Sequence, residues 1–117
     1  LQLMLGHGCE GLPYMLYRLN YMHQAGIRSQ RYERLKPLQH DLFHYMRNNV
    51  LATNSGLPFG LAVKLMIDVM GEDRVMYAMD YPYQFVPDEV RLMDNLDITE
   101  EQKKKFFQTN AERWFKL

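Results

Sequence analysis

The chain has 117 residues, which is enough for one domain with one modest core. Apolar residues make up 47% of it and charged residues 24%, a balance that excludes an intrinsically disordered chain. Lys and Arg together number 14, as do Asp and Glu, so no net charge favours nucleic acid or an anionic membrane surface.

The single cysteine, Cys9, excludes an internal disulfide framework and fits a reducing compartment. No apolar run approaches the ~20 residues of a membrane span, and no secretion signal is recognisable. We therefore expect a cytoplasmic protein. The chain opens at Leu1, already within an apolar run, and a terminal strand needs partners on its edges. We expect it to be the carboxyl-terminal part of something longer.

The first unit along the chain is a strand followed by a helix. Leu1–Leu5 is a short apolar run typical of a buried strand. Apolar residues spaced by three and four then predict a core-facing helix over Leu12–Gln24, with Pro13 in its first turn and Gly26 as its C-cap. The basic, polar stretch Ile27–Pro37 is expected to be an exposed excursion.

The second unit repeats this order. A helix is predicted over Leu38–Asn48, then a strand over Val50–Thr53 that ends in the loop Asn54–Gly56. A further helix is expected from Pro58 to Met70, closed by Gly71. Its predicted inward face consists of apolar residues four apart, namely Leu61, Leu65 and Val69.

The third unit begins with a strand over Arg74–Met79. A helix starting at Pro87 follows, and Thr99 with Gln102 three residues later forms a capping-box pattern for the last helix. The residues expected to face the core from these two helices are Val90, Met93, Leu96, Phe107, Ala111, Trp114 and Phe115.

Alternating strands and helices predict an α/β fold with parallel strands and right-handed crossovers. Three such strands would make about three-eighths of an eight-stranded barrel, which needs roughly 250 residues in all. His7, Ser55 and Asp80 each stand at or just after the end of a predicted strand, where such barrels carry their reactive groups. This shared position is our main reason to expect an enzyme site.

Two of these residues suit chemistry, and each has a structural alternative. His7 can bond a carboxylate or a metal through one ring nitrogen while Glu10, three residues on, fixes its tautomer through the other. The alternative is a strand-end histidine satisfied by a backbone carbonyl. Asp80 lies in an apolar stretch, so its carboxylate must be paired, protonated or metal-bound. Its alternative is an Asx-turn cap of the following loop.

Other candidates are weaker. His40 and His44 have the i,i+4 spacing of a metal clamp, but no third ligand is near in sequence, so exposed histidines are expected. Cys9 beside Glu10 is expected to pack rather than react, because a neighbouring carboxylate raises a thiol pKa. Lys103–Lys105 are expected on a solvated helix face.

Beyond these patterns, the sequence resembles the carboxyl-terminal third of the aromatic acid decarboxylases of the amidohydrolase superfamily. The stretch Tyr21–Arg34 most resembles the 5-carboxyvanillate decarboxylases among them. The other segments that carry the resemblance are Gly6–Pro13, Arg18, Gly71–Tyr83 and Phe106–Leu117.

The resemblance implies a fold and an activity. It implies that residues 1–117 are one partial domain, the last three βα units (about strands 6 to 8) of a (β/α)8 TIM-type barrel. These enzymes remove a carboxylate from a small phenolic acid without oxygen, using one divalent ion, manganese or zinc, and no organic cofactor. Family members are typically dimers or tetramers, so a homo-oligomer is expected at full length, with no nucleic acid or membrane partner.

The resemblance also assigns roles to residues. Asp80 matches the metal-binding aspartate that donates a proton to the ring, and His7 the histidine that contacts the departing carboxylate, oriented by Glu10. Arg18 and Tyr83 match residues that hold the far carboxylate and the ring substituents. Family members usually have Met-Gly between the histidine and the glutamate, where this chain has Gly-Cys, so the turn after His7 differs.

Two other interpretations stay open. One is a different activity in the same superfamily, a hydrolase or a hydratase, and the other is a non-catalytic truncated homologue. The family's remaining metal ligands lie on the first and fifth strands, which this sequence does not contain. One carboxylate does not hold a catalytic metal, so the isolated chain is expected to be inactive.

Overall fold

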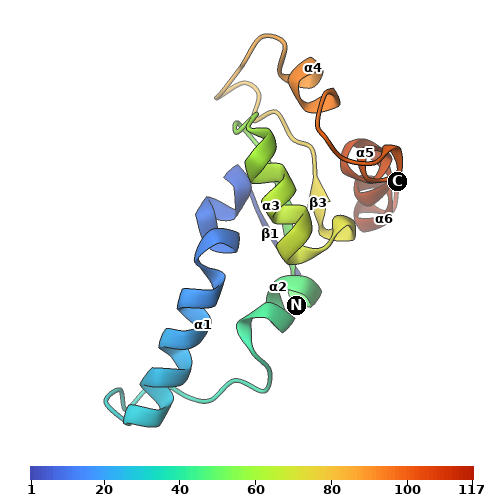
Figure 1. Cartoon of the computed structure of the whole chain (residues 1–117). Helices are drawn as coiled ribbons and strands as arrows, with labels where there is room; N and C mark the ends of the chain where they lie inside the picture. The colour runs from blue at the N-terminus through green and yellow to red at the C-terminus, as the bar shows by residue number, and fades with distance from the viewer.

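Three short parallel strands form the centre of the molecule. The structure is a computed structural model that describes all of residues 1–117. The strands β1 (Leu3–Leu5), β2 (Val50–Thr53) and β3 (Val75–Met76) form one sheet in the order β1-β2-β3, with both pairs parallel (Figure 1). The predicted α/β order with parallel pairing is therefore confirmed.

Helices and short helical turns fill the connections. In chain order they are η1 (His7–Gly11), α1 (Leu12–Ser29), α2 (Leu42–Asn49), α3 (Gly60–Met70), η2 (Glu72–Arg74), α4 (Glu89–Asp94), α5 (Glu100–Lys104), η3 (Lys105–Thr109) and α6 (Asn110–Phe115). None of them is long and apolar enough to cross a bilayer.

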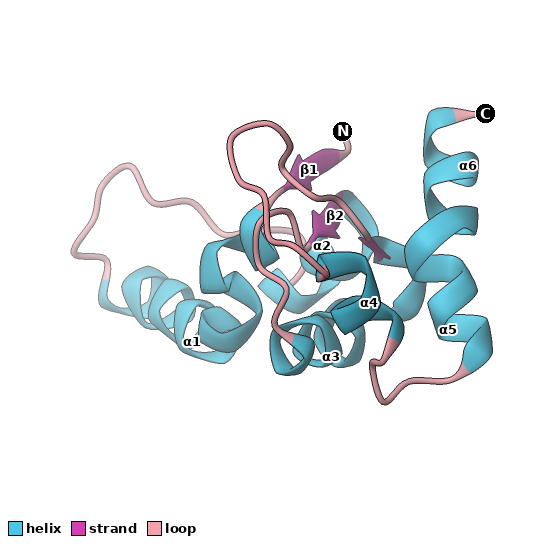
Figure 2. Ribbon diagram, turned by 90° about the horizontal axis from the view of Figure 1, so that it is seen from above, coloured by secondary structure: helices cyan, strands magenta, loops and turns pink.

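The helices cover one side of the sheet and one of its edges. Figure 2 shows α1, α2 and α3 on one side, with α5 and α6 beside β3. The backbone N–H of Tyr77 donates to the Phe106 carbonyl at 2.8 Å, which closes the β3 edge, whereas β1 pairs with no strand on its outer side. Every residue of β2 is buried, while Leu3 and Met4 of β1 are half exposed.

The core is a cluster of 13 buried apolar side chains. It joins β2, β3 and α3 to single residues from the other elements. Burying one such side chain fully contributes about 1.5–3 kcal/mol, so this cluster is the main source of stability. Its members are Cys9, Leu16, Met46, Val50, Ala52, Val63, Met66, Ile67, Met70, Val75, Met93, Leu96 and Phe106.

The first helix is longer than predicted. We expected it to end near Gln24 with Gly26 as its cap, but α1 continues to Ser29 and ends at Gln30, which has a left-handed φ of 51°. Gly26 instead permits close packing, because a Cβ there would lie 2.6 Å from the Leu35 side chain of the returning loop. The prediction of a cap at Gly26 was wrong.

Two element boundaries moved for local reasons. The helix predicted from Leu38 begins only at Leu42, because the Asp41 carboxylate accepts the backbone N–H of His44 at 2.8 Å and caps α2 there. The strand predicted over Arg74–Met79 pairs only over Val75–Met76. The first strand likewise begins at residue 3 rather than 1.

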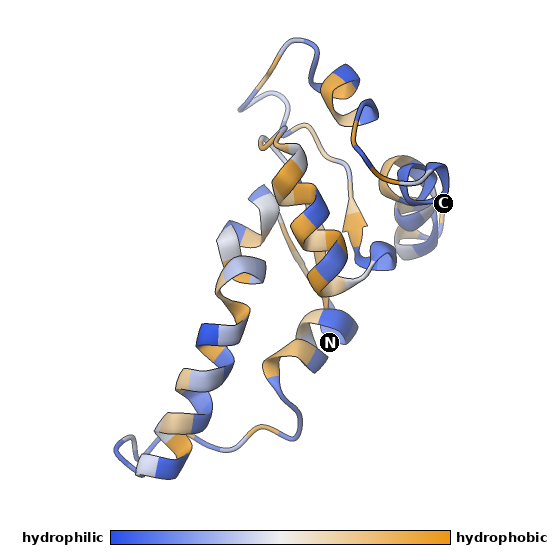
Figure 3. Ribbon diagram, viewed as in Figure 1, coloured by the Kyte–Doolittle hydropathy of each residue, from blue (hydrophilic) through white to orange (hydrophobic).

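The predicted inward face of α3 was wrong for Leu61 and Leu65, whereas Val69 packs against the core as predicted. Leu61 is 68% exposed and Leu65 is 37% exposed, and the buried residues of this helix are Val63, Met66, Ile67 and Met70. Only Lys64 and Asp68 are polar in this helix, so most of its surface is apolar (Figure 3). The 3.6-residue period therefore does not identify the face that meets the sheet.

The carboxyl-terminal helix follows its predicted start and departs later. The Thr99 and Gln102 capping box is present in full. A wide π turn at Lys105–Thr109 then changes the buried positions to Phe106 and Asn110, while Phe115 is 57% exposed. In α4 Met93 is buried as predicted, but Val90 is half exposed; Leu96 is also buried as predicted, although it lies beyond the end of α4 at Asp94.

The lysine run is not simply a solvated face. The Lys105 ammonium group bonds the Glu72 carboxylate and lies 3.0 Å from Asp73 Oδ1 and 3.6 Å from Glu101 Oε1. The prediction holds for Lys104, which is exposed, and fails for Lys105, because the π turn directs its side chain toward η2.

Candidate active site at the strand ends

The carboxyl ends of the three strands carry the candidate residues to one turn. His7 follows β1, the turn Asn54–Gly56 follows β2, and Asp80 lies beyond β3. His7 Nδ1 lies 2.8 Å from the Ser55 carbonyl oxygen. The Asp80 carboxylate packs against the same turn, since a Cβ on Gly56 would lie 3.3 Å from its Oδ2. The turn after β2 therefore brings His7 and Asp80 together.

The hydrogen bond of His7 defines its tautomer. A carbonyl oxygen only accepts, so Nδ1 donates to Ser55 and carries a proton. The second nitrogen, Nε2, is then a free acceptor in the neutral ring and a donor in the imidazolium. His7 is exposed, so Nε2 is open to a ligand.

Ser55, and not Glu10, is the partner that orients His7. Glu10 is exposed and makes no hydrogen bond or ion pair in the structure. The backbone from His7 to Glu10 is left-handed throughout, with φ of 49°, 66°, 56° and 50°. Each non-glycine residue in this region costs roughly 1–2 kcal/mol, so the turn after His7 is strained.

Asp80 also has a left-handed backbone, with φ of 69°. Its carbonyl oxygen accepts the N–H groups of Tyr83 at 2.9 Å and Gln84 at 3.1 Å, so the following turn is held by backbone and no Asx cap forms. The half-buried carboxylate has no hydrogen-bond or ion-pair partner in the chain. Such a group is available to a proton, a metal ion or a substrate.

The structure does not join Arg18 and Tyr83 to this pair. Arg18 is exposed on α1, and Tyr83 is 89% exposed in the segment after β3. Neither side chain makes a hydrogen bond or ion pair with His7 or Asp80; the only direct bond is from the Tyr83 backbone N–H to the Asp80 carbonyl. Their side chains are free to meet a ligand, and their roles stay predictions.

A buried polar cluster beside the strand ends was missed by sequence reasoning. Asn54 is fully buried and Glu89 is 1% exposed; Asn54 Nδ2 donates to Glu89 Oε1 at 3.4 Å. The second oxygen of Glu89 and the hydroxyl of Tyr77 lie near each other, but neither makes a hydrogen bond of good geometry. Burial, and then the nearby Glu89 carboxylate, raise the pKa of the Tyr77 hydroxyl. Sequence offers no signal for Glu89, because an acidic residue in the first turn of a helix usually faces water.

The chain does not complete a metal site by itself. No group of three or more His, Cys, Asp or Glu side chains comes together. His40 and His44 are exposed, as predicted, and stack on one another with ring centroids 3.9 Å apart. At the strand ends the chain offers one carboxylate, Asp80, and one free imidazole nitrogen, on His7.

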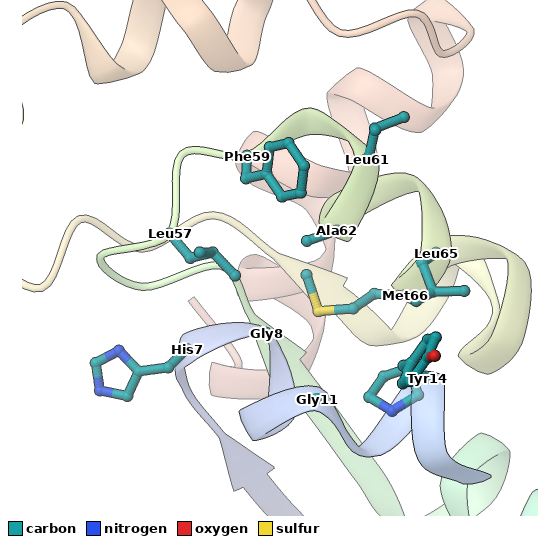
Figure 4. Close-up of a pocket in the computed structure, with 11 residues that line it drawn as sticks. His7, Gly8, Gly11, Tyr14, Leu57, Phe59, Leu61, Ala62, Leu65 and Met66 are labelled. Carbon is teal, nitrogen blue, oxygen red and sulfur yellow. The ribbon is translucent and has the colours of Figure 1, made fainter.

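Cys9 packs as predicted, although for a different physical reason. It is fully buried, and burial raises the pKa of its thiol to about 11. An apolar hollow of about 250 Å³ lies nearby, between η1 and α3. His7 is one of the lining residues, but Figure 4 shows its ring directed away from the other labelled side chains, and Asp80 is not among the lining residues. The candidate site is therefore the strand-end turn and not this hollow.

Comparison with known proteins identifies the family. The chain matches the amidohydrolase family over residues 1–117. It is 30% identical over 120 residues to a γ-resorcylate decarboxylase of Rhizobium sp., and the match covers 100% of this chain and 35% of that relative. The chain thus spans about a third of the length of the relatives it matches.

Solved structures agree with this assignment. The 5-carboxyvanillate decarboxylase of Novosphingobium aromaticivorans, complexed with manganese and 4-hydroxy-3-methoxy-5-nitrobenzoic acid, superposes with a TM-score of 0.96 at 66% identity, covering 99% of this chain and 33% of that one. The 5-carboxyvanillate decarboxylase of Sphingomonas paucimobilis gives 0.90 at 33% identity, covering 99% and 34%. From the strand-end geometry and these matches together, the chain belongs to the amidohydrolase family and forms about a third of its barrel fold.

Proposed function

We propose that this chain supplies the proton-donating side of a metal-dependent, non-oxidative decarboxylase for a phenolic acid of the 5-carboxyvanillate type. It would act as part of a complete (β/α)8 barrel. The observation that carries the proposal is the meeting of His7 and Asp80 at the Asn54–Gly56 turn. The 66% identity to a 5-carboxyvanillate decarboxylase supports this choice of substrate.

Asp80 would act as the proton donor. Its carboxyl group delivers a proton to the ring carbon that bears the leaving carboxylate. The bond from that carbon to the carboxylate then breaks, its electron pair restores the aromatic ring, and carbon dioxide leaves. Nothing is oxidised or reduced, so no organic cofactor is needed. The unpartnered carboxylate supports this role, since no residue of the chain competes for it.

Asp80 would also be this chain's ligand to a divalent ion, manganese or zinc, whose other ligands lie outside these residues. When bound, such an ion supplies positive charge beside the phenolate and carboxylate oxygens of the substrate. Manganese is the metal present in the Novosphingobium aromaticivorans relative. We also propose that the complete enzyme is cytoplasmic and homo-oligomeric.

His7 would hold the departing carboxylate through Nε2. Because Nδ1 already donates to Ser55, a hydrogen bond from Nε2 to a carboxylate requires the doubly protonated ring. The attraction between the imidazolium and the departing group would then weaken as the carboxylate becomes neutral carbon dioxide. Glu10 remains a proposed catalytic residue, although Ser55 already orients the ring.

Arg18 and Tyr83 would bind the rest of the substrate. A guanidinium makes two parallel hydrogen bonds to a carboxylate, which suits Arg18 to the far carboxylate of a dicarboxylic phenol. The exposed Tyr83 hydroxyl would bond a ring substituent. Holding the ring in one orientation is itself a large part of such catalysis.

A labelling experiment tests the proposal directly. The complete enzyme with Mn²⁺, incubated with 5-carboxyvanillate in D₂O, should release carbon dioxide and give vanillate with one deuterium at the vacated carbon. Nuclear magnetic resonance and mass spectrometry of the product read this position. Hydrolysis of an ester or amide without decarboxylation would contradict the proposal and favour a hydrolase.

The isolated 117-residue chain provides the complementary test. With one carboxylate at the strand ends, it should show no turnover even with excess Mn²⁺. Measurable carbon dioxide release by the purified chain alone would contradict the assignment of the remaining ligands to other strands.

A further inference from the structure

The buried cluster of Asn54, Tyr77 and Glu89 has a role beyond packing. We propose that Asn54, held in one orientation by Glu89, is a positioning residue that fixes His7 and Asp80 relative to each other. The inference rests on the proposed function for its catalytic readout. Its geometry, however, stands on contacts within this chain.

Asn54 first sets the path of the chain toward Asp80. The last backbone pair between β2 and β3 is Thr53 with Met76. Beyond it, β2 turns away, and the side-chain oxygen Oδ1 of Asn54 accepts the backbone N–H of Ala78 at 3.0 Å. The side chain thus continues the sheet pairing to a point two residues before Asp80.

Asn54 also sets the direction of His7. The Ser55 carbonyl that accepts from His7 Nδ1 belongs to the next residue of the same turn. This turn is closed by a hydrogen bond from the Leu57 N–H to the Asn54 carbonyl at 2.9 Å. A rotation of the Asn54 backbone would therefore move the oxygen that holds the imidazole ring.

Glu89 selects the orientation of the Asn54 amide. Its carboxylate oxygen only accepts, so it faces Nδ2 and leaves Oδ1 for the Ala78 N–H. A flipped amide would place oxygen against carboxylate and NH₂ against N–H. Both clashes are buried, where they are costly.

The burial of Glu89 supports a role other than stability. A carboxylate that is 1% exposed has lost its hydration, and one of its oxygens makes no hydrogen bond of good geometry. An apolar side chain of similar volume would avoid this loss. The carboxylate therefore destabilises the fold and in return orients the amide beside it.

Four variants of the complete enzyme test this role. Asn54→Ala and Glu89→Met remove the orienting contacts, and both should lower kcat about 10- to 100-fold while KM changes less than threefold. Glu89→Gln keeps an acceptor for Nδ2 and should recover most of kcat. The matched control is Asn110→Ala, because Asn110 is equally buried but donates to backbone carbonyls at the other end of β3. It should lower Tm and leave kcat unchanged.

Several outcomes would overturn the proposal. One is a wild-type kcat in folded Asn54→Ala. Another is an equal loss of kcat in Glu89→Gln and Glu89→Met. Such a result would mean that the charge of Glu89 matters, and not the orientation that it gives to the Asn54 amide. A third is a kcat loss in Asn110→Ala as large as that in Asn54→Ala. If Asn54→Ala does not fold by circular dichroism, Asn54→Ser takes its place in each comparison.

A spectroscopic readout separates this inference from the substrate. In protein labelled with ¹⁵N-histidine, His7 should show a protonated Nδ1, and Asn54→Ala should shift that resonance or mix the tautomers, while Asn110→Ala should not. The signal is assigned by its loss in His7→Gln. A protein that decarboxylates no phenolic acid but shows this shift would refute the proposed function and support the positioning role. An unchanged His7 signal in Asn54→Ala would refute the positioning role itself.

Discussion

The two ends of the sheet differ in how completely their polar groups are satisfied. At the amino end, the Asn110 amide donates to the carbonyls of Glu72 and Val75 at 2.7 Å and 2.9 Å. The Trp114 indole donates to a third backbone carbonyl at 3.1 Å and stacks under the Arg74 guanidinium at 4.7 Å. Lys105 neutralises the acidic side chains around it. Almost every buried group there has a partner.

The carboxyl end is the opposite. One oxygen of Glu89 and the hydroxyl of Tyr77 are buried without a hydrogen bond of good geometry, and the half-buried Asp80 carboxylate is unpaired. The backbone is also strained, since most left-handed residues of the chain lie at this end, at His7, Gly8, Cys9, Glu10, Gly11, Gly56, Asp80 and Asp88. In parallel α/β folds the amino end supports stability and the carboxyl end carries the reactive groups, and we propose the same division for this chain.

The largest expected difference between the ends comes from two aspartates. In the complete enzyme, Asp80→Asn removes the proposed proton donor and should lower kcat by about 1,000-fold or more. Asp73→Asn, whose carboxylate pairs with Lys105 at the amino end, should leave kcat unchanged. Steady-state carbon dioxide release measures both. Equal losses in the two variants would remove the functional distinction between the ends.

A second difference concerns the Cys9 thiol in the strained turn. Because burial raises its pKa from 9.0 to about 11, the thiolate fraction at pH 8 should be about 100-fold lower than in the unfolded chain. Native protein should therefore react with a disulfide reagent at least that much more slowly than protein in urea. Rapid native labelling would mean that the turn opens readily. Because the folded pKa is the higher one, unfolding releases a proton between pH 9 and about 11, so the free energy of unfolding should fall as the pH rises through this range.

Two glycines with left-handed backbone sharpen the comparison further. Alanine at Gly56, with φ of 66°, would collide with Gln84 and press on Asp80, so kcat should fall about 10-fold. Alanine at Gly71, with φ of 97°, meets no atom within 4 Å and should only destabilise, by about 1 kcal/mol. Kinetics and urea unfolding of both variants give the measurement. A loss of kcat in Gly71→Ala but not in Gly56→Ala would contradict the assignment of the functional site to the carboxyl end of the sheet.

The smallest expected effect lies at the amino end and depends on pH. The hydrogen bond from Lys105 lowers the pKa of Glu72. Its contribution to stability is thus present above the unfolded pKa of about 4.3 and is lost as the pH falls through the lower folded value. Lys105→Met should make the free energy of unfolding fall less steeply below pH 5. If the free energy of unfolding falls equally steeply below pH 5 in both proteins, the Lys105–Glu72 pair contributes nothing to stability.

Sequence predicted the features that depend on local pattern. The short apolar runs before His7 and Asp80 predicted the parallel strands β1 and β3, and Thr99 with Gln102 predicted the start of α5. Each of these signals lies within a few residues of the chain. No tertiary contact is needed to read them.

The features it missed depend on contacts between distant segments. The Ser55 carbonyl accepts the hydrogen bond of His7 from 48 residues away. Every residue has a backbone carbonyl, so no residue type in the sequence indicates this contact. Glu89 is buried only because α4 lies over Asn54. The error in the predicted buried face of α3 has the same origin. This helix is apolar nearly all round, so its buried side depends on how it packs against the sheet.

The π turn at Lys105–Thr109 determines which residues of the last helix face the sheet. A π turn holds about one more residue per turn than an α-helix, so it accommodates one residue without rotating the helix that follows. In a regular α-helix the same extra residue would rotate every later residue by about 100° about the helix axis. The Asn110 amide would then face away from the two carbonyls it serves, and Trp114 would leave Arg74. Without the wide turn, the same side chains would follow one another but contact the wrong neighbours.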